Sequence, residues 1–351
     1  MQTVRFIARG LKTSAKLLKA AAVYPDSAQA LISRCSPAAV RPAVHQVSGV
    51  CPNRRPSGWL STRRLADSTT NHVKFNEPIP ANDLPRTAGI CSMYRLPVVP
   101  DSNGLDVCFI GVPLDQGTSN RSGTRFGPRQ IRSESPQVRR FNQDTGASPY
   151  DSLQVADVGD VNMTIYDIEE AARNIRDTFS YLLSTGYRCK ILHGTPIRRA
   201  VEEGLIDSHR TVQIGIRSSV LSFDDIEWTL DQGFRVVPAN HYYHKSMAPL
   251  MEEVRQMMGD KPVYISFDID ALDPSFAPGT GTPEIGGLTT IQVLEIIRGC
   301  RGLNIVGGDL VEVSPPYDQS GNTALTAACF LFEMLCIFPR VKYVTMPARL
   351  G

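Results

Sequence analysis

Two kinds of hydrophobic periodicity alternate along the chain from about residue 105 onward. Short, continuous apolar runs rich in β-branched and aromatic residues are typical of strands buried on both faces. Segments in which apolar residues recur every three or four positions predict helices. We predict strands at Asp106–Leu114, Val155–Val161, Thr211–Arg217, Phe234–Pro238, Pro262–Asp270 and Asn304–Val313, and helices at Ile168–Thr185, Asp224–Gln232, Met247–Met258, Thr290–Arg298 and Thr323–Phe338.

This alternation of strands and helices predicts an α/β fold. Continuously apolar strands joined by helices imply a three-layer α/β/α arrangement, in which helices cover both faces of a mainly parallel sheet. Active sites in such folds lie at the carboxyl ends of the strands.

The stretch from Pro262 to Leu288 places acidic residues at one of those strand ends. Side chains alternate along a strand, so Asp268 and Asp270 are predicted to point the same way before a loop rich in Gly and Pro. Buried carboxylates repel one another unless a cation lies between them, and Mg²⁺ or Mn²⁺ suits oxygen ligands. A bare Asp-x-Asp is also typical of a helix cap or a solvated turn.

The longer sequence around these residues is more specific. SFDIDALDPSFAPGTGTPE resembles the signature of the ureohydrolases, the arginase and agmatinase family, and most of the chain from about Gly104 is similar, above all to the agmatinase branch. The Gly-rich segment GTSNRSGTRFGPRQIRSES resembles an agmatinase loop, with Ser122 and Thr124 where that branch usually has Pro and Ala. The resemblance implies an arginase-like fold.

The resemblance also implies a reaction, the hydrolysis of a guanidinium group to urea and an amine. Two Mn²⁺ ions per subunit lower the pKa of a bound water, and the resulting hydroxide attacks the guanidinium carbon. By similarity, Asp268 bridges both metals, Asp270 binds one, and His193 in His-Gly-x-Pro carries the proton to the departing amine. A lone His beside Gly is otherwise more often structural.

Similarity also suggests the substrate-binding residues. Glu312 matches the carboxylate that holds the substrate guanidinium, a geometry that suits bidentate hydrogen bonds, although an internal Arg could pair with it instead. Glu284 and Asn120 match agmatinase positions, which indicates agmatine, giving putrescine in polyamine metabolism, rather than arginine. Other guanidino-alkyl amines or acids remain open.

One internal segment of the family pattern is missing. The family takes four further metal ligands from a Gly-Gly-Asp-His segment and an Asp-Ala-His-x-Asp segment. Here Tyr187–Ile191 resembles the start of the first of these strands and runs directly into Leu192-His193-Gly194-Thr195-Pro196, which normally follows the second. A strand–helix–strand unit of roughly 30 residues or more is therefore absent. We expect at most weak or single-ion Mn²⁺ binding.

No other residues replace those ligands obviously. His241 and His244 have the spacing of a ligand pair on a helix, but their polar surroundings are typical of a solvated helix start. The chain is then either a shortened isoform, or a faulty gene model, of an active enzyme, or a non-catalytic relative that acts as a binding or regulatory subunit. The resemblance implies a homo-oligomer in either case.

The N-terminal segment differs in composition from the rest. Residues 1–66 contain spaced basic residues and a single acid, Asp26, which is typical of a mitochondrial transit peptide; a disordered basic tail is the alternative. We expect a matrix location, an N-terminal arm at 67–104 that lies on the domain or on a neighbouring subunit, and a ureohydrolase domain at 105–345.

Composition excludes several other classes. The chain has 37 basic and 35 acidic residues, so no nucleic-acid partner is indicated. No apolar run approaches the roughly 20 residues of a membrane span. The eight cysteines include no Cys-x-x-Cys pair and are expected to be reduced.

Overall fold

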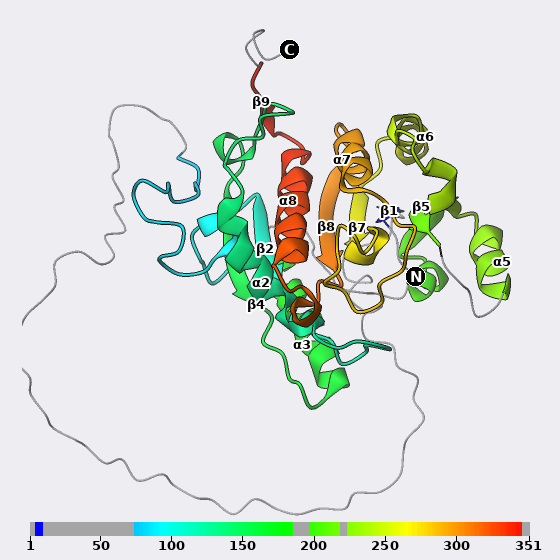
Figure 1. The fold of residues 1–351 in the computed structure, drawn as a ribbon, viewed down its shortest axis with the longest axis horizontal. Coiled ribbons are helices and arrows are strands. Elements are labelled where there is room, and N and C mark those ends of the chain that lie inside the picture. Colours follow the sequence, from blue (N-terminus) through cyan, green and yellow to red (C-terminus); the bar gives the residue numbers. More distant parts are fainter. Residues whose placement is uncertain (1–3, 10–73, 185–196, 218–222, 346–351) are drawn as a thin grey trace, which may run out of the picture. The chain divides into compact units, whose positions relative to one another are not determined.

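The main sheet has five strands in the order β6-β5-β1-β7-β8. The computed structural model (Figure 1) describes residues 4–9, 74–184, 197–217 and 223–345. The strands are β1 (Val4–Arg9), β5 (Ile206–Ile216), β6 (Arg235–Pro238), β7 (Val263–Asp268) and β8 (Ile305–Val311). β5 pairs with β6 in parallel, and so does β7 with β8, as the sequence predicted.

β1 was not predicted. It runs antiparallel to both neighbours, so that Phe6 is paired with Val212 of β5 and with Ile265 of β7. An inserted strand satisfies the backbone groups on the facing edges of two strands that would otherwise lack partners. Val4–Arg9 lie within the segment that the sequence predicts to be a transit peptide, and in the structure these residues form a strand.

Two smaller sheets complete the strands of the described chain. β2 (Val107–Gly111) pairs in parallel with β4 (Val155–Asp160), and β3 (Ala147–Ser148) pairs antiparallel with β9 (Lys342–Tyr343). A cavity of about 90 Å³ is lined by residues of both β2 and β8, including Phe109 and Val311. Within the described residues, β2 pairs only with β4, and β8 pairs only with β7. The predicted strand start at Tyr187–Ile191 lies outside the described residues.

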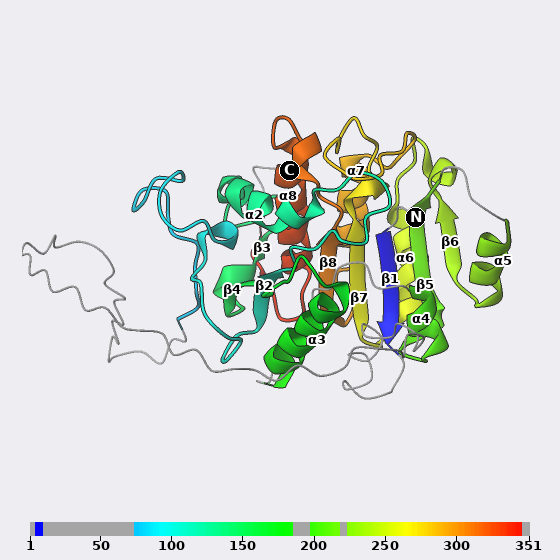
Figure 2. The same cartoon turned by 90° about the horizontal axis from the view of Figure 1, so that it is seen from below.

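Helices cover both faces of the strands. Figures 1 and 2 show α3 (Ile168–Ser184) on one face and α6 (Ala248–Met258) and α7 (Thr290–Gly299) on the other. The three-layer prediction is thereby confirmed. The remaining helices are α2 (Gly127–Glu134), α4 (Ile197–Glu202), α5 (Phe223–Asp231) and α8 (Asn322–Cys336), of which α2 and α4 were not predicted. None of the helices in the described ranges combines the length and apolar character that a membrane crossing requires.

The core lies where α8 packs against β7 and β8. The rings of Phe267 and Phe330 meet edge to face at 5.2 Å, and both side chains are buried. Gly308 of β8 lies close to β7, since a Cβ there would come within 3.0 Å of the Ile265 carbonyl oxygen. Burying one large apolar side chain contributes about 1.5–3 kcal/mol, so this contact fixes β7 and β8 against α8 firmly.

The described part of the N-terminal arm lies on the domain. Its short 3-10 helix η1 (Met93–Arg95) is buried, and the Tyr94 hydroxyl donates to the Ala328 carbonyl of α8 at 2.7 Å. The Met93 backbone N–H donates to Asp157 of β4 at 2.7 Å. The arm is thus tied to α8 and β4.

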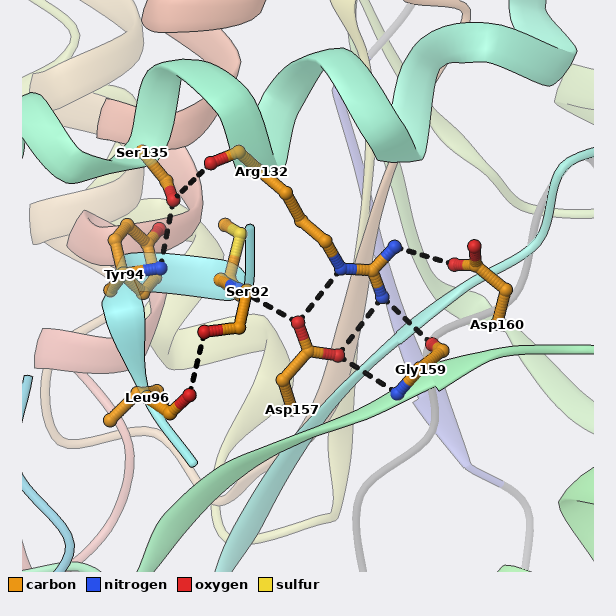
Figure 3. A network of polar contacts seen from close by, with 9 residues as sticks. Ser92, Tyr94, Leu96, Arg132, Ser135, Asp157, Gly159 and Asp160 are labelled. Carbon is orange, nitrogen blue, oxygen red and sulfur yellow. Dashed lines mark hydrogen bonds and ion pairs between the residues drawn. The ribbon is translucent and has the colours of Figure 1, made fainter. Parts of the chain in front are cut away.

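Arg132 of α2 is the centre of the polar network that holds the arm (Figure 3). Its guanidinium donates to both carboxylate oxygens of Asp157, at 2.8 and 3.0 Å, to Asp160 at 2.6 Å and to the Gly159 carbonyl at 2.8 Å. Both Arg132 and Asp157 are buried. Removing one partner of such a pair leaves a buried charge without compensation.

Replacing Arg132 by Met should therefore lower the free energy of unfolding by about 3–5 kcal/mol. Urea denaturation followed by circular dichroism measures this change. Arg140→Met is the matched control, because the exposed pairs of Arg140 with Glu77 and Asp151 should contribute less than about 1 kcal/mol. Equal losses in the two variants would contradict the role assigned to the buried network.

Candidate active site

Asp268 and Asp270 lie at the carboxyl end of β7, as predicted, but not on one strand face. The strand ends at Asp268, whose carboxylate accepts a hydrogen bond from the Asp270 N–H at 2.9 Å and caps the 3-10 helix η6 (Ile269–Ala271). The prediction that the strand continues to Asp270 is wrong, because this cap turns the chain. Asp268 is thus a helix cap, which was the alternative interpretation of a bare Asp-x-Asp, and the turn places Asp270 in the interior.

Asp270 is a buried carboxylate whose two oxygens are not both hydrogen-bonded by the described residues. Its exposed fraction is 2%. One carboxylate oxygen accepts from the Thr282 hydroxyl at 2.5 Å, while Oδ1 has no hydrogen-bond partner in the part of the chain that the structure describes. Burial raises the pKa of Asp270 to about 7, the Glu312 charge adds to this rise, and the Thr282 hydrogen bond opposes it. A cationic group at Oδ1 would remove this deficit.

Glu312 follows β8 directly, at the same edge of the sheet. Its φ is +70°, in the left-handed region that a non-Gly residue occupies only under constraint, and such outliers gather at functional sites. Glu312 Oε2 would lie 3.7 Å from a Cβ on Gly281, and the Arg121 carbonyl 3.0 Å from the same point. A side chain at Gly281 would therefore crowd the Arg121 carbonyl, while Glu312 lies at ordinary contact distance.

The loops on both sides of Glu312 are joined by hydrogen bonds. Asn120 donates its side-chain amide to the Gly281 carbonyl at 2.9 Å. Ser314 donates its N–H to the Gly279 carbonyl at 2.8 Å, and Thr280 forms an isolated antiparallel bridge with Val313. Asn120, predicted to bind substrate, thus positions the loop that borders Glu312.

The structure brings most of the predicted site residues to one edge. Asp268, Asp270 and Glu312 come from the ends of β7 and β8, and Asn120 reaches them through Gly281. Glu284 is partly exposed on the loop after Thr282. His193 lies outside the described residues. His241 and His244 are exposed, which agrees with the solvated position expected for them.

Two residues at this edge were not predicted from the sequence. Thr282 donates to Asp270, and Arg217, the first residue after β5, donates to the carbonyls of Asp270 and Glu284, each at 2.7 Å. A sequence signal for Arg217 does exist. It is a charged residue directly after an apolar strand that ends at the same edge as β7.

Comparison with known proteins identifies the family. The arginase family model matches residues 105–192 and 185–336, which together exceed half of the chain. The chain belongs to the arginase family. It is 53% identical to chicken "Agmatinase, mitochondrial" over 313 residues, with 77% of this chain and 92% of that protein covered. It is 50% identical to human "Guanidino acid hydrolase, mitochondrial", with 83% and 95% covered.

Solved structures of the arginase family agree with the fold. Proclavaminate amidino hydrolase from Streptomyces clavuligerus is 35% identical, with a TM-score of 0.68 over 73% of this chain and 99% of that one. The arginase-like α/β class implied by the sequence is confirmed. By family, the chain is a hydrolase of amidino compounds.

The family implies a metal site, and the aspartates after β7 are the candidate ligands for it. The unpartnered Oδ1 of Asp270, beside Asp268, suits one cation. However, the described ranges contain no group of three His, Cys, Asp or Glu side chains that could hold a metal ion. A pair of divalent ions needs more carboxylates and imidazoles than these. The residues in the described ranges therefore do not fit a dinuclear Mn²⁺ centre.

Asp268→Ala should abolish whatever Mn²⁺ binding the chain has, because the two aspartates are the strong oxygen ligands that the sequence offers. Isothermal titration of the full chain with Mn²⁺ measures this. Asp260→Ala, at an exposed turn before β7, is the control and should bind as the unmodified chain does. Unchanged binding by Asp268→Ala would place the metal elsewhere.

Proposed function

We propose that this chain is an agmatinase-like ureohydrolase by descent, whose site recognises the guanidinium of agmatine and whose catalytic power is reduced by the missing segment. The observation that carries the proposal is the buried Asp270 carboxylate, with one unpartnered oxygen, in electrostatic contact with Glu312 at the ends of β7 and β8. Two neighbouring carboxylates attract a cation, and a guanidinium offers planar, forked donors that match a carboxylate.

The loops support this role for Glu312. The absence of a side chain at Gly281 leaves room beside the carboxylate, and Asn120 fixes the Gly281 carbonyl. By resemblance to agmatinases, we place the far end of a substrate whose guanidinium is held at Glu312 near Glu284. A carboxylate there would attract the terminal ammonium of agmatine, as the resemblance to agmatinases suggested.

The reaction proposed for the complete site is hydrolysis to putrescine and urea. Water adds to the guanidinium carbon, the carbon–nitrogen bond to the alkyl chain breaks, and the departing amine takes a proton. By resemblance, His193 carries that proton, which is general acid catalysis. Activating the water requires a stronger electrostatic centre than the described residues provide.

Two observations support a loss of turnover in this chain. The family model matches in two separate pieces, which overlap at residues 185–192, where Tyr187–Ile191 runs into His193. The alignment with the chicken protein spans 313 positions although it covers only 77% of these 351 residues, so that relative has aligned positions that this chain lacks. Both agree with an absent strand–helix–strand unit.

A second candidate function is that of a non-catalytic binding or regulatory subunit. The lack of a three-ligand metal group in the described ranges favours it. A guanidino acid is the alternative ligand, because the human relative is named for guanidino acids. Measuring the Mn²⁺ content of the purified chain separates the hydrolase from the non-catalytic subunit. An active chain needs two Mn²⁺ per subunit, and a binding subunit needs none.

Expressed as written, the chain should release urea from agmatine on the order of 10³-fold more slowly than a chain with the missing segment restored between Cys189 and His193, because metal activation of water supplies most of the rate. A urea assay with excess Mn²⁺ measures both proteins. Comparable turnover would show that the sequence contains ligands not recognised above. An inactive restored chain would contradict the proposed hydrolysis.

We also propose that residues 1–66 direct the protein to mitochondria. The segment is basic with one acid, and the chicken and human relatives are both named as mitochondrial. A fluorescent protein fused after Ala66 should enter the matrix. A fusion in which the basic residues of the segment are replaced by Gln should stay in the cytosol. A diffuse cytosolic signal from the first fusion would reject the leader.

A further inference from the structure

β1 runs against the direction of the other strands of the main sheet that the structure describes. β5 pairs with β6 in parallel, β7 pairs with β8 in parallel, and β1 is antiparallel to both β5 and β7. The strands on the two sides of β1 therefore run in the same direction. Figure 2 shows β1, in blue, between them. Without β1, the main sheet would consist of two parallel pairs separated by a gap one strand wide.

Main-chain pairing holds β1 along both edges. Against β7, the register is continuous over Val4–Ala8. Against β5, it breaks between Ile7 and Ala8, and residues 208–210 of β5 are left without a partner in β1. Pairing of this kind uses backbone N–H and C=O groups, which every residue except proline has. The gap between β5 and β7 therefore selects an extended segment of suitable length more than a particular sequence.

The described sheets have two places for the two strands of the unit that is missing from the family pattern. One place lies between β5 and β7, where β1 is found. The other lies beside the cavity of about 90 Å³ that residues of both β2 and β8 line. Of the described strands, β2 pairs only with β4, and β8 pairs only with β7. This match indicates that β1 occupies a place that belongs to the missing unit.

Chain order assigns the gap beside β5 to the second of the missing strands. The missing unit would end just before α4, and α4 leads directly into β5. Parallel strands joined by a single helix usually lie next to each other, so the second strand would lie beside β5. β6 takes one side of β5. The other side of β5 is the one that β1 occupies.

An unfilled gap at this position would be costly, because the strands on its two sides are buried. Val212 and Ile214 of β5, and Ile265 and Phe267 of β7, are at most 1% exposed. Several buried backbone groups without partners cost an amount of free energy comparable to the net stability of a domain. A chain without the family strand can therefore fold only if another segment pairs with these two edges.

We infer that the gap between β5 and β7 is a strand-binding site, and that Val4–Arg9 occupies it in place of the second strand of the missing unit. The segment can enter in the opposite direction because a strand edge accepts antiparallel as well as parallel partners. Val4 is paired with Phe267, the residue before Asp268, so the substitute strand also supports the end of β7 that carries the candidate site. Restoring the missing unit should displace Val4–Arg9 from the sheet.

Hydrogen exchange tests the inference on two proteins, the full chain as written and the same chain with the missing segment restored between Cys189 and His193. In the chain as written, the amides of residues 4–9 should exchange on the order of a hundredfold more slowly than in an unstructured peptide. In the restored chain they should exchange as in the peptide, while residues 211–214 and 263–267 stay protected in both proteins. Fast exchange at residues 4–9 in the chain as written, or unchanged protection there in the restored chain, would overturn the inference. Neither result depends on agmatine or Mn²⁺, so this test is independent of the proposed hydrolysis.

Phe6→Pro tests the same pairing by substitution, because proline has no N–H to donate and does not fit a strand with neighbours on both sides. In the chain as written, this variant should speed exchange at residues 211–214 and 263–267 on the order of tenfold, and complete unfolding would be the same result in stronger form. In the restored chain, it should change nothing. Ala22→Pro, in the same N-terminal segment but outside β1, is the matched control and should affect neither protein. Equal effects of Phe6→Pro in both proteins, or no effect in the chain as written, would show that β1 is not a substitute strand.

Discussion

The parallel pairing of β7 with β8 is the constraint on which the candidate site depends. This pairing puts Asp268 opposite Val311, so that Glu312 emerges one residue later at the same edge. The contact between the rings of Phe267 and Phe330 packs the pair against α8. Carboxylates from two strands therefore meet at one point because of backbone hydrogen bonds and apolar packing, and their mutual repulsion is imposed by the fold.

The fold offsets that repulsion with contacts from three other segments. Thr282 donates to Asp270, Asn120 fixes the loop beside Glu312, and Arg217 contributes a positive charge bound to main-chain carbonyls. One oxygen of Asp270 still lacks a partner in the described part of the chain. A buried acceptor of this kind costs on the order of 1–3 kcal/mol, more when it is charged. Natural proteins retain such a cost where a ligand removes it, which is the physical basis of the function proposed here.

The N-terminal strand β1 makes the main sheet mixed, because it is antiparallel to both of its neighbours. β1 fills the space between two strands that run parallel to one another, and it fills it in the opposite direction. A strand from the far end of the chain can do this because Val4, Phe6 and Ile7 suit a strand, and the backbone groups of Val4–Arg9 can pair with strand edges that lack partners.

The sequence alone determined the elements and much of the site's chemistry. Continuous apolar runs predicted the strands β2 and β4–β8 to within a few residues, apart from the start of β5, because strands buried on both faces consist mainly of apolar residues. Apolar residues at helical spacing predicted α3, α5, α6, α7 and α8 equally closely. The family resemblance, carried by the residues around Asp268 and Asp270, was confirmed. Local patterns could not reveal contacts between distant segments. The pairing of β1 with β5 and β7, and the hydrogen bonds from Arg217 to the Asp270 and Glu284 carbonyls, each join residues far apart in sequence. Only the tertiary structure decides such contacts, because at least one partner in each is a backbone group, which every residue has, so the order of side chains does not identify it.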